Sequence, residues 1–173
     1  MAYRVVITGP ESTGKTELAR FLSEQLNGRL IPEYARYYVS NLDRSYSFSD
    51  VEHIGKWQRE HYHSVKPEER LVVLDTWLII TRVWFESVFQ KVPIWIDDEL
   101  SENKPDLCLL CYPDIAWQPD PVRENGGQMR FVLFEKYEEL LKMHAYPYQI
   151  IKGRGVDRKN NALKVIHERL NIS

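Results

Sequence analysis

Eight residues near the start of the chain carry the clearest chemical signature. Residues 9–16 read GPESTGKT and match the pattern G-x-x-x-x-G-K-T without a mismatch. Such a glycine loop lets successive backbone N–H groups point into one concavity, where they bind phosphate oxygens. Its lysine reaches the β- and γ-phosphates of ATP, and the hydroxyl that follows binds Mg²⁺. We therefore predict that ATP is bound by Gly9, Glu11, Ser12, Thr13, Gly14, Lys15, Thr16 and Glu17.

Two carboxylates come directly after short apolar runs. Asp75 closes the run LVVLD and could hold hydrated Mg²⁺ together with Thr16, or take the proton of the acceptor, unless it caps the next helix. Glu33 follows the run RLIP and could bind ribose hydroxyls or deprotonate one, unless it forms a surface pair with Arg36. The sequence predicts that Lys15, Glu33 and Asp75 are catalytic and leaves open which carboxylate is the general base.

Residues 113–128 contain three prolines and two glycines and therefore predict a long loop. Loops longer than about 12–15 residues in compact domains are usually functional lids or disordered segments. Arg123 would offer a fixed fork of donors to phosphate oxygens, and Trp117 could contact the substrate. We predict a lid with a catalytic Arg123; the alternative is a mobile loop with a chance arginine.

Three further side chains have ambiguous roles. Trp77 and Trp84 are at helical spacing; Trp84 fits a core stripe, whereas Trp77 is nearer the expected active edge and could stack on a substrate ring. Arg158 follows the glycine-containing segment at residues 153–155, on the expected adenine side, and could lie against the adenine face.

The elements that position these residues alternate between strands and helices. Apolar runs predict strands at residues 3–8, 29–32, 71–75, 106–112 and 148–151. One helical pattern follows the glycine loop, and others recur at residues 33–41, 49–65, 77–89, 95–102, 129–144 and 160–170. The helix at residues 49–65 opens with a capping-box pattern at Ser49 and Glu52. This alternation predicts an α/β fold with a five-stranded parallel sheet covered by helices on both faces. Ligands of such sheets bind at the carboxyl ends of the strands, where the loop, Glu33, Asp75 and the lid should converge.

The composition fits one domain over residues 1–173. Net charge is −2, so no basic excess indicates nucleic acid, and no run of eighteen apolar residues predicts a membrane span. The chain enters its first strand at once, so no signal peptide is expected and a cytoplasmic location is predicted. Cys108 and Cys111 are three apart on a strand and should point to opposite faces as packing residues.

Several motifs together resemble a known family. The glycine loop, E-Y-A-R at residues 33–36, Gln58-Arg59, Asp75-Thr76 and W-x-x-D-x-x-R at residues 117–123 occur in order and at suitable separations. In this respect the chain resembles, over nearly its whole length, the ribosylnicotinamide kinase domain of NadR-type NAD-salvage proteins. The resemblance implies a P-loop fold of the nucleoside- and nucleotide-kinase type and ATP-dependent phosphorylation of the 5′-hydroxyl of nicotinamide riboside. It implies substrate contacts from Glu33, Tyr34, Arg36, Gln58, Trp77, Trp117 and Asp120.

This chain departs from the family pattern around the substrate base. Pro32 stands where an aromatic residue often precedes E-Y-x-R, and His63 stands where a tyrosine is expected. Tyr34, Tyr62, Trp77 or Trp117 would then have to supply the aromatic wall for the ring. The alternatives that remain are a kinase of another nucleoside or sugar, and a nucleotide-binding switch whose output is a protein partner.

Overall fold

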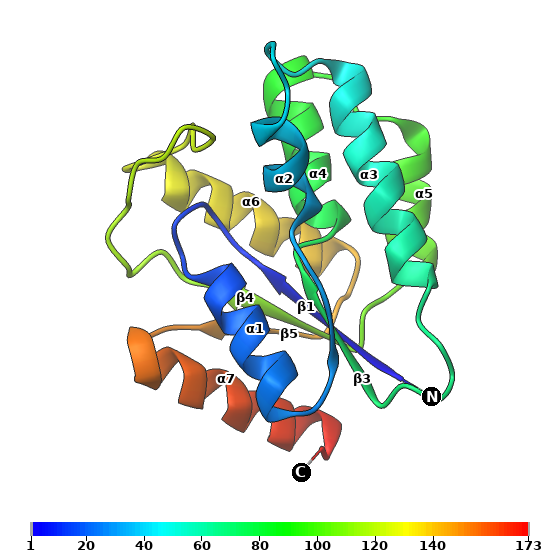
Figure 1. Cartoon of the computed structure of the whole chain (residues 1–173), viewed down its shortest axis with the longest axis vertical. Helices are drawn as coiled ribbons and strands as arrows, with labels where there is room; N and C mark the ends of the chain where they lie inside the picture. Colours follow the sequence, from blue (N-terminus) through cyan, green and yellow to red (C-terminus); the bar gives the residue numbers. More distant parts are fainter. Residues whose placement is uncertain (1, 173) are drawn as a thin grey trace.

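The computed structural model describes residues 2–172 and contains one parallel sheet (Figure 1). Its strands lie in the order β2-β3-β1-β4-β5, and every neighbouring pair is parallel. Their bounds are Tyr3–Thr8 (β1), Arg29–Ile31 (β2), Leu71–Asp75 (β3), Leu107–Cys111 (β4) and Tyr148–Ile151 (β5). The predicted five-stranded parallel sheet is therefore confirmed.

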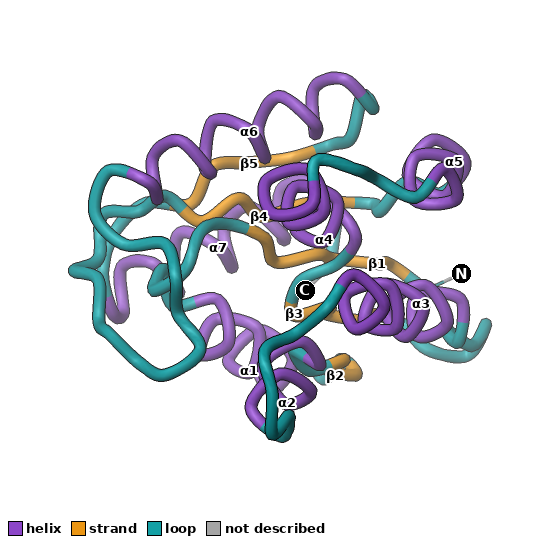
Figure 2. The backbone as a smooth tube through the Cα atoms, turned by 90° about the horizontal axis from the view of Figure 1, so that it is seen from above, coloured by secondary structure: helices purple, strands orange, loops and turns teal. Residues whose placement is uncertain are grey.

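Helices cover both faces of the sheet, as Figure 2 shows from above. They are α1 (Lys15–Gln25), α2 (Tyr34–Ser40), α3 (Phe48–His63), α4 (Leu78–Trp84), α5 (Ile94–Glu102), α6 (Met129–Met143) and α7 (Gly155–Leu170), with a π-helical turn η1 (Phe85–Phe89) directly after α4. Buried side chains of α1 and α7 form one apolar cluster with the sheet, and those of α3 to α6 form a second cluster with it. The two clusters bury both faces, which explains why the strands are apolar throughout rather than alternating.

The two cysteines show this division within one strand. Cys108 belongs to the cluster on the α3–α6 side, and Cys111 belongs to the cluster on the α1–α7 side. Both are free and fully buried, and burial raises the pKa of both thiols. The predicted role as packing residues on opposite faces is confirmed.

The start of α3 corrects a sequence-based prediction. The capping box is formed by Ser47 and Asp50, not by Ser49 and Glu52. The backbone N–H of Ser47 donates to Oδ2 of Asp50 at 2.7 Å, and the Asp50 backbone N–H donates back to the Ser47 hydroxyl. Arg44 also binds the Asp50 carboxylate and is the largest cause of the lowered pKa of Asp50. The box is therefore displaced by two residues because aspartate takes the place of the usual glutamate.

Other helix boundaries also differ from the predictions. The predicted helix at residues 77–89 divides into α4 and η1, and α7 begins at Gly155 rather than at Asn160. Within residues 2–172, no helix combines the length and apolar character needed to cross a membrane.

Candidate active site

The glycine loop connects β1 to α1 and needs glycine at two positions. Gly9 has φ +143°, and a Cβ there would lie 2.8 Å from the carbonyl oxygen of Cys111. Gly14 has φ +74° and lies at the N-terminus of α1. Any other residue at Gly9 would clash with the end of β4, so the loop is confined between two strands. This geometry directs the loop's backbone N–H groups and the helix N-terminus toward one anion site.

Arg158 supports the loop from behind, which corrects its predicted place against the adenine ring. Its side chain is only 3% exposed and donates to the carbonyl oxygens of Thr13 and Tyr112, each at 2.9 Å. It also forms an ion pair with Asp114 and donates to the carbonyl oxygen of Gly153. Since these contacts enclose the guanidinium, Arg158 links the ends of β4 and β5 to the glycine loop and offers no open face for a base.

Lys15 and Thr13 both bond to the loop itself. The Lys15 ammonium donates to the carbonyl oxygen of Pro10 at 2.7 Å, and the Thr13 hydroxyl donates to the same oxygen at 2.9 Å. The Lys15 ammonium carries two further donors that are free to meet a phosphate.

Asp75 at the end of β3 is the buried carboxylate of the site. The Thr16 hydroxyl donates to its Oδ2 at 2.7 Å, while its buried Oδ1 has no hydrogen-bond partner within residues 2–172. Burial raises the pKa of Asp75 to about 6, with the nearby charge of Glu33 as the next cause. Asp75 does not cap α4, whose N-cap is Trp77.

These two residues fit a Mg²⁺ ion. The ion prefers oxygen ligands and is commonly held by one or two carboxylates together with substrate phosphates and water. The unpaired Oδ1 of Asp75 and the adjacent Thr16 hydroxyl supply such oxygens. Among residues 2–172 there is no cluster of three or more His, Cys, Asp or Glu side chains that could hold a metal without a nucleotide.

Glu33 and Arg36 stand at the carboxyl end of β2. Glu33 is the N-cap residue of α2, and its carboxylate lies 3.7 Å from Nε of Arg36. Both side chains line the pocket that contains the glycine loop, and so does Thr76, which follows Asp75. Thr76 has φ +70°, an unusual conformation for a β-branched residue and one that concentrates at functional sites. The predicted meeting of Glu33, Asp75 and the loop at one edge is confirmed.

Residues 113–128 cross over the glycine loop. The backbone N–H groups of Glu124 and Asn125 donate to the two carboxylate oxygens of Glu11, at 3.1 and 2.9 Å. The backbone N–H of Gln118 donates to the Ser12 hydroxyl at 2.9 Å. The segment is thus tied to the loop at two points, in the position that a lid requires.

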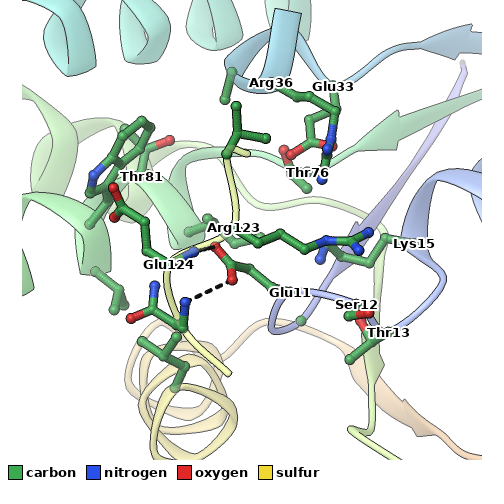
Figure 3. A pocket seen from close by; sticks show the side chains of 18 of the residues that line it. Glu11, Ser12, Thr13, Lys15, Glu33, Arg36, Thr76, Thr81, Arg123 and Glu124 are labelled. Atoms are coloured by element: carbon green, nitrogen blue, oxygen red, sulfur yellow. Dashed lines mark hydrogen bonds and ion pairs between the residues drawn. The ribbon is translucent and has the colours of Figure 1, made fainter. Parts of the chain in front are cut away.

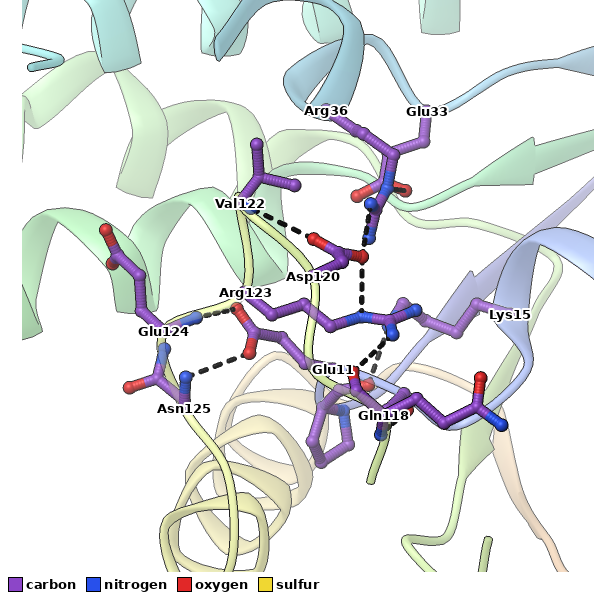
Figure 4. A network of polar contacts seen from close by, with 12 residues as sticks. Glu11, Lys15, Glu33, Arg36, Gln118, Asp120, Val122, Arg123, Glu124 and Asn125 are labelled. Carbon is purple, nitrogen blue, oxygen red and sulfur yellow. Dashed lines mark hydrogen bonds and ion pairs between the residues drawn. The ribbon is translucent and has the colours of Figure 1, made fainter. Parts of the chain in front are cut away.

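Asp120 of the lid binds two arginines, Arg36 of α2 and Arg123 of the lid itself (Figure 4). Its Oδ2 lies 2.7 Å from Nη1 of Arg36 and 3.2 Å from Nε of Arg123. Arg123 also donates to the carbonyl oxygen of Gln118 at 2.5 Å. Burial raises the pKa of Asp120, but the hydrogen bond from Arg36 and the other contacts outweigh it, so the pKa is lowered overall. Arg123 is therefore held in the pocket by its own loop before any ligand is bound.

The pocket has a volume of about 680 Å³ and two distinct ends. Figure 3 shows Lys15, Ser12 and Thr13 on one side and Thr81 and Glu124 on the other. We call the first the phosphate end; it comprises residues 9–17 with Arg123. We call the second the aromatic end; its lining includes Val39, Tyr46, Ile80, Thr81, Val83, Trp84, Ser87, Val88, Val122 and Glu124. Met129, Val132, Leu133, Lys136 and Tyr137 of α6 complete the wall.

Several residues predicted to bind substrate lie elsewhere. Trp77 is fully buried and stacks on Tyr62 at a centroid distance of 4.3 Å, because its extended backbone turns the ring into the core before α4 begins. Tyr34 stacks on Trp57 at 4.4 Å, and the Trp117 ring packs against Gly126. None of these rings is among the described residues that line the pocket. The predicted aromatic wall is therefore wrong.

Gln58 does line the pocket, as predicted. Its Oε1 accepts a hydrogen bond from the Thr81 hydroxyl at 2.5 Å. This bond fixes the amide so that its nitrogen remains available as a donor.

Two aromatic residues that line the pocket, Tyr46 and Trp84, are not predicted to do so by the sequence. Trp77 lies in the core rather than at the site. Trp84 packs against the core, as predicted, but is only half-buried and also lines the pocket. Tyr46 lies between the helices predicted at residues 33–41 and 49–65, where no pattern predicts a function. No sequence pattern marks Trp84 as a pocket residue, because the π-helical turn η1 that follows it is visible only in the structure.

Comparisons with known proteins agree with this architecture. The model of the AAA domain family matches residues 4–158. The chain is 24% identical over 159 residues to the trifunctional NAD biosynthesis/regulator protein NadR of Salmonella typhimurium strain LT2; the match covers 88% of this chain and 39% of the relative. The chain thus spans well under half the length of that protein.

Solved structures give the same result for the fold. A crystal structure of NadR protein in complex with NR superposes with a TM-score of 0.86 and 24% identity, over 99% of this chain and 52% of the other. Thymidylate kinase from Ehrlichia chaffeensis superposes with a TM-score of 0.65 and 17% identity, over 96% and 98% of the two chains. The predicted resemblance to NadR-type proteins and the predicted P-loop kinase fold are confirmed.

Proposed function

We propose that this chain, which belongs to the AAA domain family, forms one ATP-dependent kinase domain that acts on small nucleosides. We propose nicotinamide riboside as the acceptor and its 5′-hydroxyl as the group that is phosphorylated, giving nicotinamide mononucleotide. One observation carries this proposal: a glycine loop with Lys15, a Thr16–Asp75 pair and the carboxylate of Glu33 all meet at one pocket. The likeness to NadR protein in complex with NR supports the choice of acceptor.

Each residue has a defined part in the transfer. Lys15 and the loop N–H groups bind the β- and γ-phosphates, and Arg123 from the lid neutralises charge on the moving phosphoryl group. Thr16 and Asp75 would hold Mg²⁺, which would supply positive charge against the phosphates when it is bound. Glu33 accepts the proton of the acceptor hydroxyl, because it lines the pocket whereas Asp75 is bonded to Thr16.

Arg36 and Asp120 orient these groups. Arg36 pairs with Glu33 at 3.7 Å and with Asp120 at 2.7 Å, and Asp120 in turn pairs with Arg123. The proposed general base, Glu33, and the phosphate-binding Arg123 are therefore linked through one chain of charges that joins α2 to the lid. Gln58 binds the acceptor from α3.

The test is direct product analysis. The protein is incubated with nicotinamide riboside and Mg-ATP, and the nucleotide product and ADP are identified by mass spectrometry. We expect equal amounts of ADP and nicotinamide mononucleotide from the wild type and none from Lys15→Ala. ATP hydrolysis without any phosphorylated nucleoside, stimulated by a protein partner, would instead support a nucleotide-binding switch.

A further inference from the structure

The proposed acceptor needs a wall for its ring, and the pocket provides one from residues outside the predicted set. Tyr46 precedes α3, Trp84 ends α4, and both line the aromatic end. Their ring centroids are 4.9 Å apart at an interplanar angle of 78°, an edge-to-face arrangement. Since such a pair holds both rings in fixed orientations, it forms a preorganised corner.

The surroundings of this corner suit a flat ring. Val39 of α2, Val83 of α4, Val88 of η1 and Val122 of the lid line the same end of the pocket. The base of the acceptor, placed there, would be enclosed by aliphatic side chains on several sides. The ribose of the acceptor would lie nearer Glu33 and Gln58. The aromatic end thus has the apolar lining with few polar groups that is typical of small-molecule sites.

One carboxylate is fixed at the corner. The Tyr46 hydroxyl donates to Oε2 of Glu124 at 3.0 Å, and burial is the main cause that raises the pKa of Tyr46, which keeps the hydroxyl a donor. The backbone of Glu124 is itself held by Glu11. Figure 3 shows Glu124 on the side of the pocket away from Lys15. Lys136 of α6 also lines the pocket and would offset part of this negative charge.

We propose that Trp84 and Tyr46 hold the base of the acceptor, and that the Glu124 carboxylate beside them makes this end select an aromatic base that carries a positive charge. The inference rests on the proposed function and specifies how that site distinguishes its substrates. Aromatic faces attract cations, and the carboxylate of Glu124, which is exposed but fixed by Tyr46, adds to that attraction. A neutral ring of the same shape would keep the apolar contacts and lose both electrostatic contributions.

The experiment compares two ribosides that differ only in ring charge. Nicotinamide riboside carries a pyridinium ring, and benzamide riboside carries a neutral phenyl ring with the same carboxamide. Dissociation constants of both are measured by calorimetry, and kcat and KM are measured with saturating Mg-ATP. The proteins are the wild type, Glu124→Gln and Trp84→Leu, with Trp84→Phe as the conservative variant. Trp95→Leu is the matched control, because that indole lies on α5 against Arg59 and outside the pocket lining.

We expect the wild type to bind the cationic riboside about 2- to 30-fold more tightly than the neutral one. Glu124→Gln should reduce this ratio by weakening only the cationic ligand, with unchanged KM for ATP. Trp84→Leu should weaken both ligands, Trp84→Phe should restore most of the loss, and Trp95→Leu should leave the ratio unchanged.

The outcomes separate the two proposals. If nicotinamide riboside is phosphorylated but Glu124→Gln leaves the ratio unchanged, the charge selection is wrong and the kinase proposal stands. Trp84→Leu that folds, as judged by thermal denaturation, and binds both ribosides like the wild type would overturn the aromatic corner. If the wild type phosphorylates neither riboside, the proposed function itself fails.

Discussion

The two ends of the pocket differ in how the chain builds them. Apart from Arg123 of the lid, the phosphate end comes from one contiguous stretch, residues 9–17, with Asp75 of the neighbouring strand behind it. The aromatic end is assembled from α2, the segment before α3, the end of α4, the lid and α6. Phosphate binding requires a fixed backbone geometry, whereas base binding needs only a shaped apolar wall that many segments can supply. The first end should therefore tolerate almost no change, and the second should respond in graded steps.

The largest effect is expected at Lys15. Lys15→Ala should lower kcat by more than about 10³-fold, since removing a single preorganised donor from an active site already costs about 10²–10³-fold. The side chain bonds only to Pro10 within residues 2–172, so the fold should be retained. Turnover close to the wild type at saturating ATP would show that the phosphate end has been assigned wrongly.

Glu33 lies between the two ends and should show a smaller, selective effect. Glu33→Gln should lower kcat by about 10²–10⁴-fold, the usual loss on removing a general base, with little change in ATP affinity. Steady-state kinetics with each substrate varied separately measures both quantities. A variant whose only defect is weaker ATP binding would assign Glu33 to the phosphate end instead.

Asp75 gives a prediction about stability. Its pKa is raised to about 6 from the usual 3.8, so the folded state holds a proton that the unfolded state releases between these pH values. The wild type therefore loses stability as pH rises through this window, by up to about 2–3 kcal/mol on an order-of-magnitude conversion. Asp75→Asn should be the more stable protein at pH 7 without Mg-ATP, and the difference should vanish near pH 4.

Urea denaturation at several pH values measures this difference. The same variant should lose activity, because the metal-holding oxygen is replaced. If Asp75→Asn is less stable than the wild type at neutral pH, contacts other than the hydrogen bond from Thr16 stabilise the buried carboxylate.

The smallest effect concerns the lid. The ties from Glu11 and Ser12 hold residues 113–128 over the loop, and a nucleotide with its acceptor should add contacts to Arg123. We expect several-fold slower proteolysis of this segment in the ternary complex and a change in Trp117 fluorescence. Unchanged cleavage and unchanged emission would refute closure around the substrates.

The contrast between the two ends of the pocket also explains which features could be predicted from the sequence. The sheet, the glycine loop and the positions of Glu33 and Asp75 could be predicted, because each depends on local pattern and on where parallel strands end. Trp77 and Trp84 could not be distinguished by spacing, since the extended backbone at Trp77 and the π-helical turn after Trp84 decide which ring reaches the pocket. Arg158 was misplaced because only the fold shows that its donors bond to the ends of β4 and β5.

The central claim is that the aromatic end is matched to nicotinamide riboside. The most direct test is a competition assay with nicotinamide riboside, adenosine, cytidine and uridine at equal concentration, with products counted by mass spectrometry. We predict that nicotinamide riboside has the highest kcat/KM, by about 2- to 30-fold, because the neutral bases lose the attraction to Trp84, Tyr46 and Glu124. A higher kcat/KM for any neutral nucleoside would contradict the claim and identify the protein as a kinase of that nucleoside.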